Sequence, residues 1–348
     1  MTSLTDGAPV LEAAGLTVHY PVHRGPIGGR VVHALEDVTL TLHPGRIVAV
    51  VGESGSGKST LARVLAMAQK PTAGSVRLSG QEVRLRSRRA RREYAARVQL
   101  VLQDPFSSLN PLHRVRYLLA RPLMLHAGVR DKAELDRRIR GLLERVALTP
   151  AERFIDAYPH ELSGGQRQRV AIARALAVHP DVILGDELVS MLDVSMRLEI
   201  LNLLSVLRDE ERLAMLYITH DIAAARYFTD EIAVMYAGEI VEYGPSEPVT
   251  QAPAHPYTKL LIGSSPDPGR ESAPEGADDD EFGEPPDLIE PPAGCRFHPR
   301  CPFAMAHCRV SAPPRVDAGD GRWARCWLLV EGDPTASGGR IDLEVKPK

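Results

Sequence analysis

The octapeptide GESGSGKS, residues Gly52 to Ser59, is the feature that most constrains the fold of this chain. It follows the apolar run IVAVV and precedes the helical pattern LARVLAMA, so G-x-x-x-x-G-K-[ST] stands between a strand and a helix. Glycines allow successive backbone N–H groups to point at phosphate oxygens, and the following helix adds its positive N-terminal end. A glycine-rich loop without function is the alternative, but the flanking strand and helix favour a phosphate-binding loop.

This loop assigns roles to individual side chains. We expect Lys58 to reach the β- and γ-phosphates of a nucleotide and the Ser59 hydroxyl to ligate Mg²⁺. The residues of the loop predicted to hold the nucleotide are Gly52, Ser54, Gly55, Ser56, Gly57, Lys58, Ser59 and Thr60.

A second apolar run, VILGDE, ends in an acidic pair. We expect it to deliver Asp186 to the Mg²⁺ shell and to place Glu187 where it polarises an attacking water. An acidic pair after an apolar run is a weak signal by itself, but it is strong beside a phosphate-binding loop. The two motifs together predict hydrolysis of a nucleoside triphosphate.

Strand and helix patterns alternate along the chain, which predicts an α/β fold with a mostly parallel sheet. The expected strands are 16–20, 47–52, 98–103, 182–186, 215–219 and 232–236. The expected helices are 58–68, 132–147, 164–178, 194–211 and 222–228. From Pro105 to His179 no convincing strand pattern occurs, so we predict a helical subdomain over about 105–178 within a larger unit of residues 1–263.

Composition excludes several other classes of protein. With 44% hydrophobic residues the chain can bury a substantial core, and a formal net charge of −3 implies no general attraction to nucleic acid or anionic lipid. No apolar run approaches the roughly 18 to 20 residues of a membrane helix, and the N-terminus lacks the pattern of a signal peptide. We therefore expect a soluble cytoplasmic protein.

The pentapeptide LSGGQ, Leu162 to Gln166, is a second glycine-rich turn that opens a helical pattern, QRQRVAIARALAV. It presents backbone donors and a helix N-terminus to an anion, but it contains no lysine. Ser163 is also a good N-cap, so an ordinary helix cap is the alternative.

These motifs together resemble the nucleotide-binding subunits of ATP-binding cassette (ABC) transporters over about residues 11–250. In that family's order they are Tyr20, the phosphate loop, VLQDP with Gln103, LSGGQ, VILGDE, SMLD with Asp193 and YITHD with His220. The resemblance implies a P-loop NTPase cassette of the α/β class. It has a RecA-like core with an antiparallel β part, a helical subdomain and, here, a small cysteine-rich C-terminal extension.

The resemblance also implies how two chains share ATP. Each nucleotide would lie between the phosphate loop of one chain and residues of a second chain in a head-to-tail dimer. Those residues are Ser163, Gly164, Gly165 and Gln166. Asp193 would cross the same interface, and hydrolysis would release the surfaces that the γ-phosphate joins.

The other motif residues take their roles from the family pattern. Tyr20 would stack on the adenine ring, with an ordinary strand-end tyrosine as the alternative. Gln103 would sense Mg²⁺ and the γ-phosphate, and His220 would keep the attacking water and Glu187 in register. The implied catalytic residues are Glu187, His220 and Gln103, and the implied Mg²⁺ ligands are Ser59, Gln103 and Asp186.

One residue departs from the family pattern. The family commonly has proline after the catalytic glutamate, whereas this chain has Leu188. Leucine does not fix φ as proline does, so we expect a freer turn. Catalysis is expected to survive, with a weakly hydrolysing regulatory cassette as the alternative.

Three further segments resemble the subfamily that energises oligopeptide and dipeptide uptake. They are DPFSSLNP, AHPYTKLL and GCRFHPRCPFAMAHC, and VSMLDVS is most similar to the second of that subfamily's paired ATPases. The resemblance implies a second ABC ATPase as partner, identical or paralogous, two transmembrane permeases docked on the helical subdomain, and an extracytoplasmic peptide-binding protein reached through the permeases. It places the chain peripherally at the cytoplasmic face of the cell membrane. Importers of nickel or sugar-related solutes remain alternatives.

Residues 264–293 are rich in Pro, Gly and acidic residues and poor in apolar ones, which predicts a mobile linker. Beyond it, residues 294–348 form the predicted extension, which contains all four cysteines: Cys295, Cys301, Cys308 and Cys326. Because the segment is weak in apolar residues, we expect metal ligation to supply folding free energy.

The spacing of these cysteines lacks the close pair usual for structural zinc. Four thiolates can instead hold a 4Fe-4S cluster, whose larger core tolerates wider spacing. Some members of the resembled subfamily have a similar segment and carry such a cluster. The cluster is favoured, and zinc or four reduced thiols packed as small hydrophobes remain alternatives.

The run RLRSRRARREYAAR, residues 84–97, is the one patch that suggests nucleic acid. The alternative is a solvated helical face beside the nucleotide site, which we favour. Members of the superfamily that act on ribosomes or DNA resemble paired cassettes in one chain or contain long coiled coils, and neither feature occurs here. We expect no nucleic-acid partner.

Overall fold

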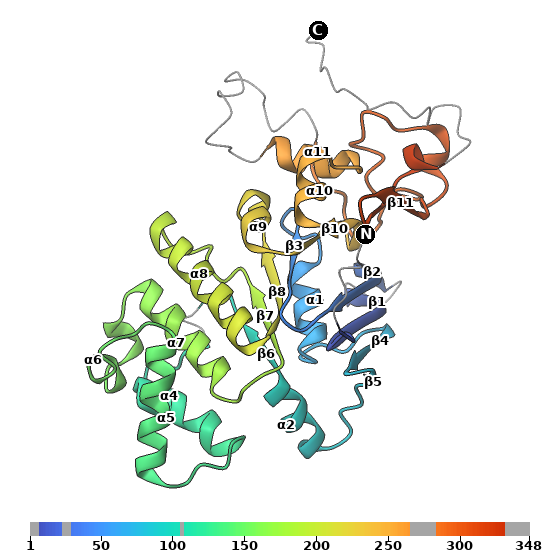
Figure 1. The fold of residues 1–348 in the computed structure, drawn as a ribbon. Helices are drawn as coiled ribbons and strands as arrows, with labels where there is room; N and C mark the ends of the chain where they lie inside the picture. Colours follow the sequence, from blue (N-terminus) through green and yellow to red (C-terminus); the bar gives the residue numbers. More distant parts are fainter. Residues whose placement is uncertain (1–6, 23–28, 105–107, 265–282, 331–348) are drawn as a thin grey trace.

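The computed structural model describes residues 7–22, 29–104, 108–264 and 283–330. Two sheets organise these residues (Figure 1). The smaller sheet has the strand order β2-β1-β4-β5, and the larger has the order β11-β12-β10-β9-β3-β8-β7-β6. The phosphate loop and the residues Gln103, Glu187 and His220 follow the carboxyl ends of strands in the larger sheet.

The larger sheet contains a parallel centre made of β3 (Ile47–Val51), β6 (Val98–Val101), β7 (Val182–Asp186), β8 (Ala214–Thr219) and β9 (Glu231–Tyr236). Every residue of β3, β7 and β8 is buried. Parallel strands covered on both faces read as continuous apolar runs, which is why the sequence predicts them well.

The smaller sheet is antiparallel and consists of β1 (Leu11–Val22), β2 (Arg30–Leu42), β4 (Ala73–Leu78) and β5 (Gln81–Glu82). Alternate residues of β1 are buried, so Leu16 and Val18 enter a core that this sheet shares with α1. The sequence predicts only the middle of β1 and none of the other three strands. Their half-exposed pattern is weaker than that of a buried strand.

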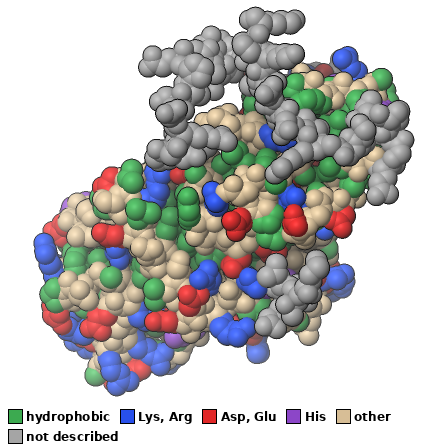
Figure 2. Space-filling model, turned by 45° about the horizontal axis from the view of Figure 1, so that its top comes forward, with side chains coloured by type: hydrophobic (Ala, Val, Ile, Leu, Met, Phe, Trp, Pro, Cys, Tyr) green, Lys and Arg blue, Asp and Glu red, His purple; other side chains and the backbone are tan. Residues whose placement is uncertain are grey.

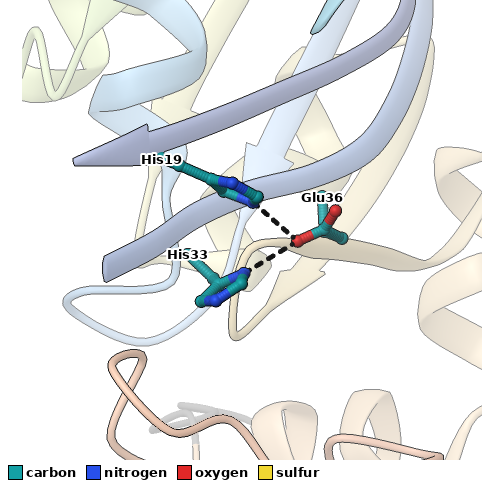
Figure 3. Close-up of side chains that lie close together, drawn as sticks. All are labelled: His19, His33 and Glu36. Carbon is teal, nitrogen blue, oxygen red and sulfur yellow. Dashed lines mark hydrogen bonds and ion pairs between the residues drawn. The ribbon is translucent and has the colours of Figure 1, made fainter. Parts of the chain in front are cut away.

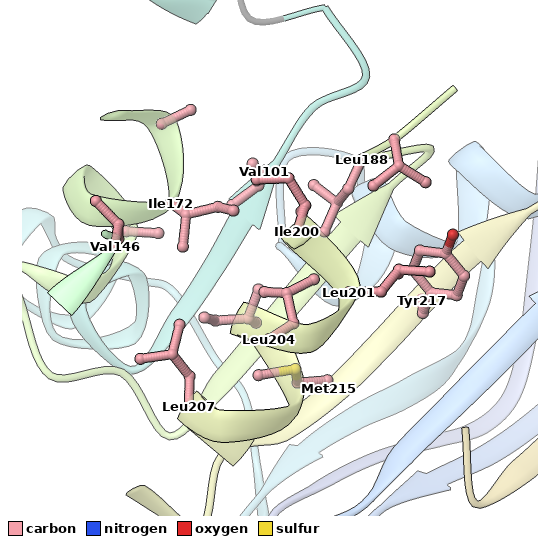
Figure 4. Packing of buried hydrophobic residues seen from close by; sticks show 14 of the residues in the cluster. Val101, Val146, Ile172, Leu188, Ile200, Leu201, Leu204, Leu207, Met215 and Tyr217 are labelled. Carbon is pink, nitrogen blue, oxygen red and sulfur yellow. The ribbon is translucent and has the colours of Figure 1, made fainter. Parts of the chain in front are cut away.

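Helices surround the parallel centre: α1 (Lys58–Leu65), α8 (Val194–Glu211), α9 (Ile222–Phe228), α10 (Ser246–Gln251) and α11 (Pro256–Gly263). Figure 4 shows Ile200, Leu204 and Leu207 of α8 packed with Met215 of β8 in the main core. The spacing of these three residues places them on one side of a helix. Among the described residues, no helix is both long and apolar enough to cross a bilayer.

A separate helical lobe holds α4 (Val115–Leu125), α5 (Lys132–Arg145), α6 (Glu152–Ile155), η1 (Pro159–Glu161) and α7 (Gly164–Leu176) (Figure 1). Within residues 108–179, all of which are described, no strand occurs, as the sequence predicts. The start of this predicted subdomain, including 105–107 of DPFSSLNP, lies outside the described residues.

The arginine run forms α2 (Arg88–Arg97), with Ser87 as its N-cap and Tyr94 as its one buried residue. Most of its arginines are exposed, as a solvated helical face requires. Its predicted place beside the nucleotide site is wrong, because the helix leads directly into the first residue of β6 and so lies at the amino edge of the sheet. Basic and acidic side chains are mixed over the face drawn in Figure 2.

The C-terminal extension continues the larger sheet. β12 (Arg322–Arg325) pairs with β10 (Glu239–Pro245), and β11 (Arg315–Gly319) pairs with β12. Phe297 is 2% exposed within the main core, between Tyr236 and Tyr257. The extension, although weak in apolar residues of its own, is therefore also stabilised by apolar contacts that the body of the protein supplies.

The described part of the predicted linker, residues 283–293, also contacts the body. The His33 backbone N–H donates to the Leu288 carbonyl oxygen at 2.8 Å, and Arg30 pairs with Glu290 at 2.8 Å. This differs from the mobile linker predicted for 264–293. Its other residues, 265–282, lie outside the described part of the chain.

His255 joins the body to the extension and makes stability depend on pH. It is 1% exposed, its Nδ1 accepts from the Tyr257 backbone N–H at 3.0 Å, and its ring lies 5.7 Å from that of Phe297. Burial lowers the pKa of His255 to about 3. As the pH falls, His255 therefore becomes protonated near pH 6.5 in the unfolded chain, whereas it stays neutral in the folded chain.

We predict that His255 costs stability as the pH falls below its unfolded pKa. The free energy of unfolding should drop by about 1.4 kcal/mol per pH unit more in the parent protein than in His255→Asn. Asparagine keeps an acceptor for the Tyr257 N–H but does not titrate. Urea unfolding between pH 7 and pH 5 measures both slopes, and equal slopes would contradict the prediction.

Candidate nucleotide-binding site

The phosphate loop joins β3 to α1 and approaches two other strands at backbone distance. Gly52 has φ +152° and Gly57 has φ +105°. A Cβ atom at Gly52 would lie under 3.0 Å from the Met235 carbonyl oxygen, and one at Gly57 under 3.0 Å from the Ala34 carbonyl oxygen. Both the conformation and the available space therefore require glycine.

Lys58 occupies the centre of this loop and is 6% exposed. Its Nζ donates to the carbonyl oxygens of Gly52 and Glu53, both at 2.7 Å. Burial lowers the pKa of Lys58, and the carboxylates of Glu187 and Asp186 oppose that shift. A cation is thus held inside the cradle that the sequence predicts for phosphate.

Ser59 and Asp186 come together although they are distant in sequence. The Ser59 Oγ donates to Asp186 Oδ1 at 2.9 Å. Burial at the end of β7 raises the pKa of Asp186, against the effect of the Ser59 hydrogen bond. Hydroxyl and carboxylate oxygens are ligands that Mg²⁺ prefers, so this pair fits the predicted ion.

Gln103, Glu187 and His220 follow three neighbouring parallel strands and converge at their carboxyl ends. Gln103 Nε2 donates to Glu187 Oε2 at 2.6 Å, and His220 Nδ1 lies 3.8 Å from Glu187 Oε1. Glu187 has φ +50°, a conformation uncommon for a residue with a side chain. The structure brings the three predicted catalytic residues together, and their roles remain predictions.

Leu188 is fixed by packing. It is 3% exposed in the main core, where Figure 4 labels it, and a Cβ at Gly185 would lie under 3.0 Å from its side chain. The turn after Glu187 therefore has a buried anchor, in contrast to the freer turn expected in the absence of proline.

The LSGGQ turn forms a helix cap. Ser163 Oγ accepts from the Gln166 backbone N–H at 3.3 Å, and Gln166 Oε1 accepts from the Ser163 backbone N–H at 3.0 Å. Asp193 likewise caps α8, accepting from the Met196 N–H at 2.8 Å. Among the described residues, no hydrogen bond or ion pair joins Ser163–Gln166 or Asp193 to the phosphate loop.

Tyr20 is half-buried in β1, opposite Val32 of β2, and packs against the core of the smaller sheet. Gly164 and Gly165 lie beside the start of α8, where a Cβ on Gly165 would meet the Met196 side chain. A single chain thus brings together the phosphate loop, Asp186 and Glu187. The part of the site formed by Ser163–Gln166 and Asp193 of a partner chain remains a prediction.

Sequence reasoning missed a bond between the phosphate loop and the C-terminal extension. The Arg300 guanidinium donates two hydrogen bonds to Glu53, at 2.8 and 3.0 Å, and lies 5.8 Å from the centre of the Tyr236 ring. Burial disfavours its charge, but hydrogen bonds to Glu53 and Tyr236 outweigh burial and raise the pKa of Arg300. The Tyr257 hydroxyl accepts from the Glu53 backbone N–H at 2.9 Å.

Only weak sequence signals point to this bond. Arg300 lies within GCRFHPRC and Tyr257 within AHPYTKLL, two segments that the sequence singles out by resemblance alone. Arg300 and Glu53 are 247 residues apart, so no local pattern identifies them as partners.

The four cysteines line one small pocket, together with His255 and Phe297, and all four are free thiols. Burial raises the pKa of Cys295 to about 11 and that of Cys326 to about 12, and neighbouring cysteines add to both shifts. A tetrahedral zinc site with Zn–S bonds of about 2.3 Å needs sulfurs about 3.8 Å apart. Among the described residues, no three of these sulfurs lie within 4.8 Å of one another.

Comparison with known proteins identifies two matching family models. One, described as "ABC transporter", matches residues 35–190, and the other, "Oligopeptide/dipeptide transporter, C-terminal region", matches residues 241–308. The second match covers the last strand and helices of the body as well as three of the cysteines.

Curated relatives resemble the chain over most of its length. The di/tripeptide transport ATP-binding protein DppF of Pseudomonas aeruginosa is 41% identical over 87% of this chain and 93% of its own length. The dipeptide transport ATP-binding protein DppF of Haemophilus influenzae is 39% identical over 93% of this chain and 98% of its own.

Solved structures share the fold of the cassette. The ATP-binding cassette MJ0796, solved as a dimer in a post-hydrolysis state with ADP and Pi, matches with a TM-score of 0.60 and 31% identity. The match covers 68% of this chain and 98% of MJ0796.

We predict that Glu53 and Arg300 are energetically coupled. A double-mutant cycle with Glu53→Gln and Arg300→Gln should give a coupling of about 1 to 3 kcal/mol in the free energy of unfolding, because both ends of a nearly buried, doubly bonded pair are lost. The exposed pair Arg84–Glu82 is the matched control, for which a much smaller coupling is expected because solvent screens it. Equal coupling in the two cycles would contradict a special role for Arg300.

Proposed function

The chain belongs to the ATP-binding proteins of peptide ABC transporters, and we propose on that basis that it is the ATPase subunit of an importer of dipeptides or oligopeptides. One observation carries the proposal: a match to the ABC transporter family and a match to the C-terminal region of oligopeptide/dipeptide transporters occur together in this chain. The subunit binds ATP and hydrolyses it to drive transport.

The geometry supports specific tasks at the phosphate loop. Lys58 turns from the carbonyl oxygens of its own loop to the β- and γ-phosphates of ATP. Ser59 and Asp186 would hold Mg²⁺, with Gln103 as the third protein ligand, and the ion would supply positive charge beside the phosphates.

Glu187 orients and polarises the attacking water. Gln103 Nε2 already donates to one carboxylate oxygen at 2.6 Å, and His220 Nδ1 lies 3.8 Å from the other oxygen. A base fixed in this way avoids the cost of finding its orientation during the reaction. Removal of its charge should therefore affect turnover far more than nucleotide binding.

A second cassette completes the site. Ser163–Gln166 presents a helix N-terminus on the helical lobe without a bond to its own phosphate loop, which supports use of this turn by the neighbouring chain. We favour a paralogous second ATPase and hence a heterodimer. ATP joins the two chains, and its hydrolysis lets them separate.

The helical lobe is the surface for two transmembrane permeases. Its described residues include large exposed apolar side chains, with Leu112 81% exposed and Tyr117 45% exposed. Coupling helices of the permeases would cover them. In the proposed complex the chain lies at the cytoplasmic face of the membrane. An extracytoplasmic peptide-binding protein delivers cargo to the permeases without touching this chain.

The cysteine pocket is a site for a 4Fe-4S cluster. Four free thiols converge there, and their separation exceeds that of a tetrahedral zinc site, which supports a larger metal core. Because burial raises the pKa of Cys295 and Cys326, binding of the cluster must release their protons.

We predict that Glu187→Gln lowers kcat for ATP by at least about 100-fold in the assembled complex with its permeases, because the residue serves as general base. ATP binding to the variant should stay close to that of the parent complex. Glu210→Gln, an exposed carboxamide substitution outside the site, is the control and should turn over normally. Undiminished turnover in Glu187→Gln would contradict the proposal, as would full-speed hydrolysis by this chain strictly alone.

For the cysteine pocket, anaerobic purification should give brown protein with about four irons per chain. Cys308→Ser should lose the colour and the iron. Stoichiometric zinc without iron in the anaerobic preparation would show that the 4Fe-4S assignment is wrong.

A further inference from the structure

Two histidines and a glutamate converge on the smaller sheet, outside the residues assigned to nucleotide binding (Figure 3). His19 Nε2 lies 3.1 Å and His33 Nδ1 lies 3.2 Å from the same oxygen, Glu36 Oε2. Their side chains are 29%, 31% and 32% exposed, so each is partly desolvated yet accessible to a small ion. Among the described residues, they are the one group of three metal-ligating atoms within 4.8 Å of one another.

A bulge explains why the three side chains share one face. Successive residues of a strand point to opposite faces, so His33 and Glu36 would be separated in a regular strand. Between the pairs Val18–Leu35 and His19–His33, β2 contains one more residue than β1. This extra residue brings Glu36 to the face of both histidines, and bulges often re-aim side chains at functional sites.

The distances agree with the edges of a metal shell. A tetrahedral ion with bonds of about 2.0 to 2.1 Å holds its ligand atoms about 3.3 Å apart. The two nitrogen–oxygen separations, 3.1 and 3.2 Å, are close to that value, and the two nitrogens lie within 4.8 Å of each other. A glutamate carboxylate is ordinarily ionised at neutral pH, so Glu36 offers an anionic ligand.

Arg296 from the C-terminal extension orients the carboxylate. Its guanidinium lies 3.4 Å from Glu36 Oε2, and it is anchored by Glu239 at 3.0 Å and by the Ala237 carbonyl oxygen. In the hydrogen-bonded cluster, Glu36 Oε2 accepts from both histidines. A metal ion would form one bond to this oxygen in their place, so the oxygen would keep a lone pair that accepts from Arg296. Such a hydrogen bond to a ligating carboxylate is typical of metal sites.

We propose that His19 Nε2, His33 Nδ1 and Glu36 form a binding site for a borderline divalent cation such as Zn²⁺, with water completing its shell. Two imidazoles and one carboxylate are a ligand set that zinc uses where it keeps an open position. Each histidine then coordinates through the nitrogen that faces Glu36 and keeps its proton on the other nitrogen.

The position of the site gives the ion a structural effect. The pair His19–His33 is next to the pair Tyr20–Val32, so a bound ion ties together the two strands beside the tyrosine assigned to adenine. This effect on nucleotide binding rests on the proposed function, whereas binding of the ion does not. If the protein binds the metal normally but does not turn over ATP, the proposed function fails and the proposed metal site stands.

Cobalt titration of the full chain tests the site, because thiolate ligation gives strong near-ultraviolet charge transfer and imidazole–carboxylate ligation gives only weak visible bands. We expect the weak visible bands of one Co²⁺ bound by imidazole and carboxylate, separate from any thiolate charge-transfer band that the cysteine pocket contributes. His33→Ala and Glu36→Gln should each weaken this binding at least about tenfold, since even outer partners of metal ligands contribute that much. His179→Asn, at an exposed position with φ +51° that asparagine tolerates, should bind as the parent does.

A second measurement needs no variant. Zn²⁺ should protect His19 and His33 of the parent protein from carbethoxylation, located by mass spectrometry, while the exposed His160 reacts as before. Equal Co²⁺ affinity in parent, His33→Ala and Glu36→Gln overturns the proposal. If the variants fail to fold, unprotected His19 and His33 overturn it, and the cluster is then a hydrogen-bonded group only.

Discussion

The close approach of backbone to backbone around the phosphate loop fixes how the two sheets and the nucleotide site are arranged. Gly52 reaches the carbonyl of Met235 in β9, and Gly57 reaches that of Ala34 in β2, at distances that exclude any side chain. The larger and the smaller sheet therefore meet at this loop. The same backbone encloses Lys58, so the position from which its Nζ would contact phosphate is fixed.

The C-terminal extension also contacts the phosphate loop and the residues around it. Within six residues, Arg296 reaches Glu36 and Glu239, Phe297 enters the aromatic core, Arg300 holds Glu53 of the loop, and Cys301 lines the cysteine pocket. One short segment thus contacts the histidine cluster, the phosphate loop and the cysteines. Arg300, which holds Glu53, is the chain neighbour of Cys301 in the cysteine pocket.

Burial explains which elements could be predicted. The strands β3, β7 and β8 are covered on both faces, so their uninterrupted apolar runs predict them from the sequence. The strands β2 and β12 alternate or are short, so their place in a sheet depends on partners far away in sequence. The same holds for Phe297, whose burial depends on Tyr236 and Tyr257 rather than on its own surroundings in the chain.

The amino-acid sequence by itself determined the loop, the acidic pair and the order of motifs that mark an ABC cassette, because glycine, lysine and carboxylate chemistry at fixed spacing is local information. The tertiary structure supplied the contacts of Gln103 and His220 with Glu187, and it alone showed that Arg300 holds Glu53 and that a bulge gathers His19, His33 and Glu36. Contacts between distant residues follow from strand order, register and packing, and these emerge only when the whole chain is folded.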